Sequence, residues 1–143
     1  MNVNQPLNPE ICGNILLIQE SNQLYKQLQR QFDNNNAKVF YVSTLSAAFD
    51  FLEGDHEPIE AILIDYLMCP SINNPFLTYL RNLRNQSPLF VLCSVYSRII
   101  EAEYKQRGVV QFIQPNMPIN KLMNVINNGI KDYCGPIHQD VYY

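Results

Sequence analysis

Five short apolar runs, separated by segments with helical spacing, constrain the fold of this 143-residue chain more than any other feature. A strand that is covered on both faces reads as a nearly continuous apolar run, and three of the five runs have that character. The second and fifth runs mix in polar positions. In chain order, the predicted strands are residues 15–18, 39–42, 61–64, 89–92 and 109–113.

The segments between these runs carry apolar residues at helical spacing and begin at residues that favour helix starts. The expected starts are, in order, Ser21 or Asn22, Ser43 or Thr44, Asn74 with Pro75, Ser97, and Pro118. The expected apolar positions are Leu24, Leu28 and Phe32; Leu45, Phe49 and Leu52; Phe76, Leu80 and Leu83; Ile100 and Tyr104; and Ile119, Leu122, Ile126 and Ile130. Strands that alternate with helices in this way predict an α/β fold, with one doubly wound parallel sheet and helices on both faces.

The chain is long enough for one domain with a sizeable core and too short for two. Its residues are 47% hydrophobic and 16% charged, which is ordinary for a globular protein. We expect an N-terminal tail over residues 1–13, the folded domain over 14–133 and a C-terminal tail over 134–143.

Charge and cysteine content limit the possible binding partners and the cellular compartment of the protein. The net charge is −3, with acids and bases interspersed, which argues against nucleic acid as a partner. A membrane is disfavoured too, because no apolar run approaches the ~20 residues that span a bilayer. The four cysteines are scattered without a C-x-x-C pair, so we expect a reduced, cytoplasmic protein.

Most classes of α/β enzyme lack their characteristic residues here. The five glycines form neither a G-x-G-x-x-G motif nor a P-loop, and there is no G-x-S-x-G motif. Neither His56 nor His138 follows a predicted strand, so no base is placed for a serine or cysteine nucleophile. The sequence therefore predicts that the protein is not an enzyme.

Two acidic residues lie at strand ends. Glu20 comes just after the first strand, and Asp65 directly follows the third. In a sheet of order 2-1-3-4-5 those strands are neighbours, and ligands bind where the strand order reverses. Either residue alone is better explained as a helix start or a loop cap. Together they favour a cation site of the kind that suits Mg²⁺, which takes oxygen ligands.

The segment from Ala61 to Pro70 resembles the receiver domain of two-component response regulators. It is similar to the family's apolar strand, phosphoacceptor aspartate and following Met-Pro turn, with one residue more before the proline. The resemblance covers about residues 14–132 and implies a flavodoxin-like sheet of order 2-1-3-4-5. It also implies that Asp65 is the phosphoacceptor, and that Glu20, Asp65 and the backbone carbonyl of Leu67 are metal ligands.

Two strand ends depart from the family pattern. The first strand normally ends in two acidic residues, whereas this chain has Gln19 and Glu20. The fourth normally ends in a threonine or serine followed by a small residue. Here Cys93 takes the hydroxyl position and Ser94 follows it, and a thiol is only a weak hydrogen-bond donor.

The fifth strand departs furthest. The family has an aromatic residue, two apolar residues and then Lys-Pro, where this chain reads Gln111-Phe112-Ile113-Gln114-Pro115. Either the lysine is deleted, so that Phe112 keeps the aromatic switch position, or Gln114 replaces the lysine. The cation is lost in both cases. An aspartyl phosphate would lose its counter-charge, so we expect phosphorylation to be weakened and Mg²⁺ binding to be weak or absent.

The sequence leaves three hypotheses for the function of the protein. The first is a degenerate receiver, or pseudo-receiver, of a phosphorelay that acts mainly through protein–protein contacts. The second is a working Mg²⁺-dependent receiver that a histidine kinase phosphorylates on Asp65. The third is an unrelated flavodoxin-like domain that binds a ligand.

We expect the partner to be a histidine kinase or another signalling protein. The expected docking and homodimer surface is formed by the fourth helix, the fifth strand and the fifth helix. The apolar side chains that the sequence offers there are Tyr96, Ile99, Tyr104, Met117 and Met123.

Overall fold

The computed structural model describes residues 13–32, 37–83, 87–94 and 97–141, with the backbone alone from residue 134. The strands are β1 (Ile15–Ile18), β2 (Val39–Val42), β3 (Ala61–Asp65), β4 (Leu89–Leu92) and β5 (Val109–Ile113). The helices are α1 (Gln23–Phe32), α2 (Leu45–Glu53), α3 (Pro75–Arg81), α4 (Arg98–Gln106) and α5 (Ile119–Val141), and a short 3-10 helix, η1 (Tyr66–Met68), follows β3.

All five strands are parallel and form one sheet in the order β2-β1-β3-β4-β5. This confirms the predicted α/β class, the doubly wound sheet and its order. The central strands start level, with Ile15 opposite Val39 on one side and Ala61 on the other. Because β1 and β3 are neighbours, the residues that follow them lie at the same edge of the sheet.

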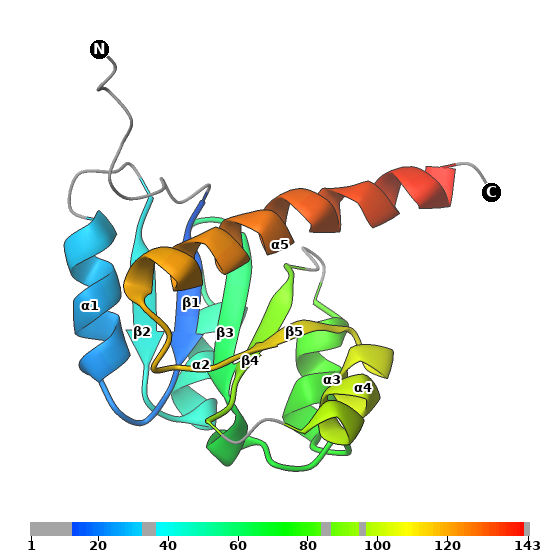
Figure 1. Ribbon diagram of the computed structural model, residues 1–143, viewed down its shortest axis with the longest axis horizontal. Coiled ribbons are helices and arrows are strands. Elements are labelled where there is room, and N and C mark those ends of the chain that lie inside the picture. The colour runs from blue at the N-terminus through cyan, green and yellow to red at the C-terminus, as the bar shows by residue number, and fades with distance from the viewer. Residues whose placement is uncertain (1–12, 33–36, 84–86, 95–96, 142–143) are drawn as a thin grey trace.

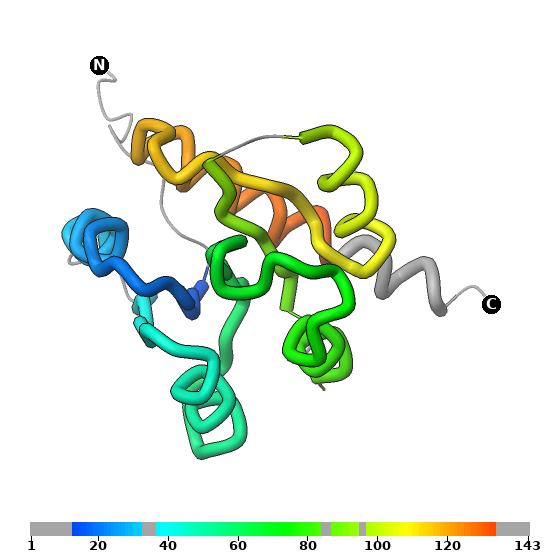
Figure 2. Tube along the Cα trace, turned by 90° about the horizontal axis from the view of Figure 1, so that it is seen from below, coloured from blue at the N-terminus to red at the C-terminus, as the bar shows by residue number. Residues whose placement is uncertain are grey.

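Helices cover both faces of the sheet, so each face has its own core (Figures 1 and 2). One core joins the sheet to α1 and α5, through residues such as Leu28 and Ile126. The other joins it to α2, α3 and α4, through Ala48, Leu80 and Tyr104. Strands buried on both faces are the reason that the sequence shows apolar runs rather than alternation.

Helix starts follow the predicted capping residues. The side chains of Thr44, Asn74 and Ser97 each accept a hydrogen bond from a backbone N–H of the helix that follows. The predicted inner face of α2 is wrong at one position. Phe49 is 45% exposed and its ring packs against Tyr79, whereas Ala48 is the buried residue of that helix.

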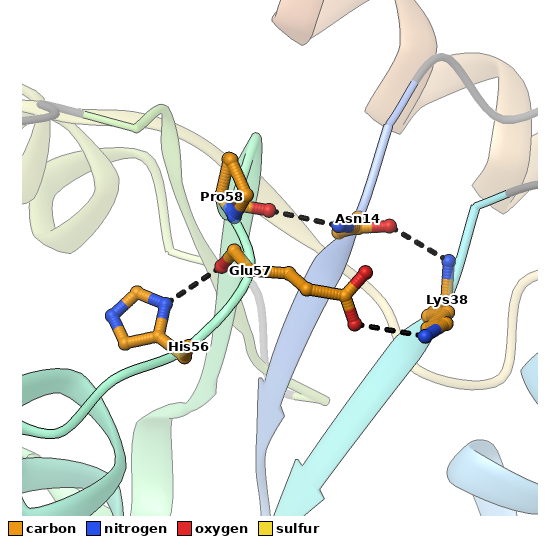
Figure 3. Close-up of polar contacts among 5 residues, drawn as sticks. All are labelled: Asn14, Lys38, His56, Glu57 and Pro58. Carbon is orange, nitrogen blue, oxygen red and sulfur yellow. Dashed lines mark hydrogen bonds and ion pairs between the residues drawn. The ribbon is translucent and has the colours of Figure 1, made fainter.

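At the amino edge of the sheet, Asn14 ties three strands together (Figure 3). Its side-chain amide donates to the carbonyl of Pro58 over 2.9 Å, and its Oδ1 accepts the backbone N–H of Lys38 over 2.9 Å. The Lys38 ammonium pairs with Glu57 at 2.8 Å, where both side chains are well exposed. These bonds join the starts of β1, β2 and β3, and so support the level register.

Helix α5 continues to Val141, past residue 133 where the sequence predicted the end of the domain. No helix in the described ranges combines the length and the apolarity needed to cross a membrane.

Candidate functional site

The candidate site lies at the carboxyl edge of the sheet, which Figure 2 views from below. Ile18 pairs with Ile64, so Gln19 follows β1 at the level of Asp65, the last residue of β3. Gln19 is buried, Asp65 is half-buried and Glu20 is exposed. The strand register therefore brings Gln19, rather than the predicted acid Glu20, against the Asp65 carboxylate.

Two N–H groups hold the Asp65 carboxylate. Its Oδ2 accepts a hydrogen bond from Nε2 of Gln19 over 3.1 Å. Its Oδ1 accepts the backbone N–H of Leu67 over 3.0 Å, which caps the start of η1. Both donors are neutral, and within the described ranges the carboxylate is held by these hydrogen bonds and by no ion pair.

The Gln19 side chain is 7% exposed, and its Oε1 has no hydrogen-bond partner within the described residues. Turning the amide over would satisfy nothing, because Oε1 would then face the Asp65 carboxylate. The orientation that places Nε2 toward Asp65 is the favourable one for this network. A charge-assisted hydrogen bond thus offsets the cost of an unpaired buried oxygen.

Within the described residues, the groups turned toward Asp65 are hydrogen-bond donors and not a set of acidic metal ligands. Mg²⁺ takes oxygen ligands, and Gln19 presents an N–H group to Asp65. Glu20 is exposed, and what is fixed there is its backbone carbonyl, which accepts a hydrogen bond from Tyr41 over 2.8 Å. Leu67 turns its N–H toward the carboxylate, and its side chain is 78% exposed. Across the described ranges, no group of three or more His, Cys, Asp or Glu residues is placed to hold a metal ion.

The predicted switch residues divide between core and surface. Cys93 is buried, and its backbone N–H donates to the carbonyl of Ile113 over 2.9 Å. Ser94, the next residue, is exposed. Phe112 is 7% exposed and belongs to the core, whereas Gln114 lies just beyond β5 and is exposed.

A tyrosine that the sequence did not assign to the site lies beneath it. Tyr104, on α4, is 2% exposed and donates its hydroxyl to the carbonyl of Cys69 over 3.0 Å. Its ring meets that of Phe112 edge-on, with centroids 5.3 Å apart, and lies 5.9 Å from that of Tyr66. The helical spacing after Ile100 pointed to this inward position, but no sequence signal indicated the bond to Cys69.

Two residues of the predicted docking surface are in the core. Tyr104 and Met123 are both buried, because each lies on the side of its helix that packs against the sheet. Ile99 is 76% exposed and Met117 is half-buried. Tyr96 lies outside the described residues.

Burial keeps the groups around Tyr104 neutral. It raises the pKa of the Cys69 thiol to about 11. Burial also raises the pKa of Tyr104, and the neighbouring Tyr66 adds to this shift. At neutral pH the thiol is therefore a small apolar group rather than a nucleophile, and the phenol remains a hydrogen-bond donor.

Comparison with known proteins places the fold. No protein-family model matches the chain, and no curated protein matches it by sequence. The receiver domain of the Francisella response regulator 1452 is 17% identical, with a TM-score of 0.68 over 85% of this chain and 98% of that one. A response regulator from Thermotoga maritima is 17% identical, with a TM-score of 0.72 over 83% and 98%. An adenylate cyclase from Rhodopirellula baltica is 19% identical, with a TM-score of 0.68 over 95% and 97%.

These similarities and the sheet order give one conclusion about architecture. The chain has the flavodoxin-like fold of response-regulator receiver domains.

Proposed function

We propose that this protein is a degenerate receiver of a two-component phosphorelay, non-enzymatic and cytoplasmic, that acts mainly by binding a histidine kinase or another signalling protein. The observation that carries the proposal is the hydrogen bond from the Gln19 amide to the Asp65 carboxylate. A receiver holds its metal ion through acids beside this carboxylate, and here the neutral Gln19 takes the place of one of them.

The charge balance supports this function. Phosphorylation of Asp65 would add about two negative charges at the edge of the sheet. Gln114, next to the position of the family's lysine, is neutral and exposed beyond β5, so it cannot cancel this charge. Gln19 stands where the family has an acid that helps to bind the metal, and it offers Asp65 only a hydrogen bond. One of the two acids and the lysine that receivers place around the phosphate are therefore missing, and Glu20 and Asp65 remain. We expect weak Mg²⁺ binding and slow phosphorylation.

The alternative is a working phosphoacceptor, and one observation favours it. Asp65 ends β3 at the edge where the strand order reverses, and its carboxylate is half-buried rather than sealed in the core. A small phosphodonor therefore has a route to this carboxylate.

Intact-mass spectrometry after incubation with acetyl phosphate and Mg²⁺ separates the two functions. We expect the parent chain to gain no phosphoryl mass under conditions that label a working receiver run in parallel. An Asp65→Asn variant is the control for labelling elsewhere. Stoichiometric labelling of the parent that disappears in Asp65→Asn would refute the degenerate assignment.

The partner surface in this proposal is the side of the molecule formed by α4, β5 and α5, with a second copy of the chain as one occupant. Ile99 is the large apolar side chain that α4 leaves exposed. Light scattering on the parent and on Ile99→Asp tests the second copy. A monomeric mass for both proteins would exclude the homodimer and leave a different protein as the partner.

A further inference from the structure

Helix α4 is tied to the turn that follows Asp65 by one buried side chain. The hydroxyl of Tyr104 donates to the carbonyl of Cys69 over 3.0 Å, and both residues are 2% exposed. Cys69 directly follows η1 as its C-cap, and the Asp65 carboxylate caps the start of η1. Tyr104 therefore connects α4 directly to the short segment that begins at the candidate site.

A second side chain ties α4 to the edge strand β5. Oε2 of Glu101 accepts the backbone N–H of Phe112 over 3.0 Å, and the Glu101 side chain is only 12% exposed. Lys105 lies 3.9 Å away and partly balances its charge. The outer N–H groups of an edge strand have no strand partner, so Glu101 supplies the acceptor that Phe112 would otherwise lack.

The rings between these two bonds leave little freedom. Tyr66, Tyr104 and Phe112 come from η1, α4 and β5, and their centroids lie 5.3–6.4 Å apart in tilted or edge-on contacts. Interiors are close-packed, so Phe112 cannot swing outward without leaving a void beside Tyr104. Helix α4 is thus held both to the η1 turn and to β5.

We propose that Tyr104 and Glu101 hold α4 in a single position, so that the α4–β5 side of the molecule is a fixed surface independent of the state of Asp65. The meaning of this for signalling rests on the proposed function, because a fixed surface suits a partner that binds without phosphorylation. The two ties themselves do not depend on it.

Hydrogen exchange read by mass spectrometry on the full chain, without any phosphate reagent, tests the first tie. Tyr104→Phe keeps the ring and removes only the hydroxyl. We expect amides of α4 and β5 to exchange on the order of tenfold faster, the effect of losing one buried hydrogen bond. Amides of β1 and β3 should keep their parent rates. Unchanged rates in α4, or the same acceleration everywhere, would overturn the proposal.

Another tyrosine provides a matched control. Tyr79, on α3, donates its hydroxyl to Glu53, on α2, so this bond does not involve α4. Tyr79→Phe makes the same chemical change and should leave exchange in α4 and β5 at the parent rate. If it accelerated α4 as much as Tyr104→Phe does, the effect would be global and the proposed tie would fail.

Glu101 is tested by a pair of variants. Glu101→Ala removes the acceptor and should speed exchange of the Phe112 amide about tenfold, whereas Glu101→Gln keeps an oxygen acceptor and should restore most of the protection. Parent-like exchange in Glu101→Ala, or equal exchange in both variants, would remove the second tie.

Asp65→Asn, which changes the charge of the site without relying on a bound ligand, tests the independence from Asp65. Exchange in α4 of this variant should match that of the parent, and a change there would overturn the proposal. The acetyl phosphate assay stands apart from these measurements. If Asp65 is phosphorylated and the exchange results support both hydrogen bonds, only the proposed function is refuted. If Asp65 is not phosphorylated and the exchange results contradict the two hydrogen bonds, only this inference is refuted.

Discussion

Replacing Gln19 with glutamate tests directly whether the Gln19 amide donates a hydrogen bond to Asp65. Gln19→Glu changes one atom group, with an oxygen in place of the amide nitrogen that now lies 3.1 Å from Oδ2 of Asp65. The donor is lost, and two carboxylates face each other at a position that is 7% exposed on the Gln19 side. The folded state should therefore lose stability, although the side chain keeps its shape.

The size of the loss can be bounded. At 3.1 Å and an effective dielectric constant near 20, two unit charges repel by about 5 kcal/mol. The pair can avoid this by binding one proton, which costs about 4 kcal/mol at pH 7 for a carboxyl of ordinary pKa. Asp65 is half-buried, so water screens part of the repulsion. With the lost hydrogen bond included, we expect a destabilisation of about 2–4 kcal/mol.

The sign of the pH dependence follows from the shared proton. The folded variant binds that proton more tightly than the unfolded chain does, so the folded state holds more protons between about pH 4 and 7. Relative to the parent, the variant should therefore recover stability as pH falls through this window. Above neutral pH, the free energy of unfolding of Gln19→Glu should fall below that of the parent by the full amount.

Urea unfolding at several pH values, followed by circular dichroism, gives the measurement. Gln29→Glu, an exposed position on α1, is the matched control with the same change in charge and should stay within about 0.5 kcal/mol of the parent. Mg²⁺ at millimolar concentration should stabilise Gln19→Glu more than the parent, because the variant adds a carboxylate directly beside Asp65. A parent-like unfolding free energy for Gln19→Glu at pH 7 would show that the Gln19–Asp65 bond is not formed in solution.

Two further predictions concern the missing cation and the buried thiol. A lysine inserted between Gln114 and Pro115 should raise the affinity for beryllofluoride with Mg²⁺ by roughly ten- to a hundredfold, the effect of one charge-assisted hydrogen bond. If titration shows that the insertion variant binds no more tightly than the parent, the hypothesis that the family's lysine is deleted at this point is refuted. Because burial raises the pKa of Cys69 to about 11, iodoacetamide at pH 8 should alkylate it only after unfolding in urea. Rapid alkylation of the Cys69 peptide in the native protein would contradict this description of the thiol.

The fold was predictable because its determinants are local in sequence. A strand buried on both faces must be apolar at nearly every position, so continuous apolar runs such as 15–18 and 61–64 indicate strands directly. Caps such as Thr44 and Ser97 place the helix starts within a residue. Position 49 was the exception, because the small residue Ala48 takes the buried position and the larger Phe49 covers Tyr79 at the surface.

The site was harder to predict because its contacts join segments far apart in sequence. The sequence showed that Gln19 lacks a charge, but not that its amide reaches Asp65, 46 positions away. The bond between Tyr104 and Cys69 spans 35 positions and follows no motif spacing. Register and helix packing decide such contacts, and neither can be read from spacing alone.

The loss of the acid at position 19 and the loss of the lysine beside position 114 depend on each other through charge. A receiver with both strand-end acids would place three carboxylates at one edge of the sheet, and a metal and a lysine would reduce their repulsion. Once position 114 carries no cation, an acid at position 19 would repel Asp65. Glutamine there removes the repulsion and adds a donor at 3.1 Å. The same exchange that stabilises the resting carboxylate removes an acidic ligand for the metal ion that a phosphoryl group would need. If the protein is the degenerate receiver that we propose, stability without phosphate and weak chemistry at Asp65 are two consequences of one side chain.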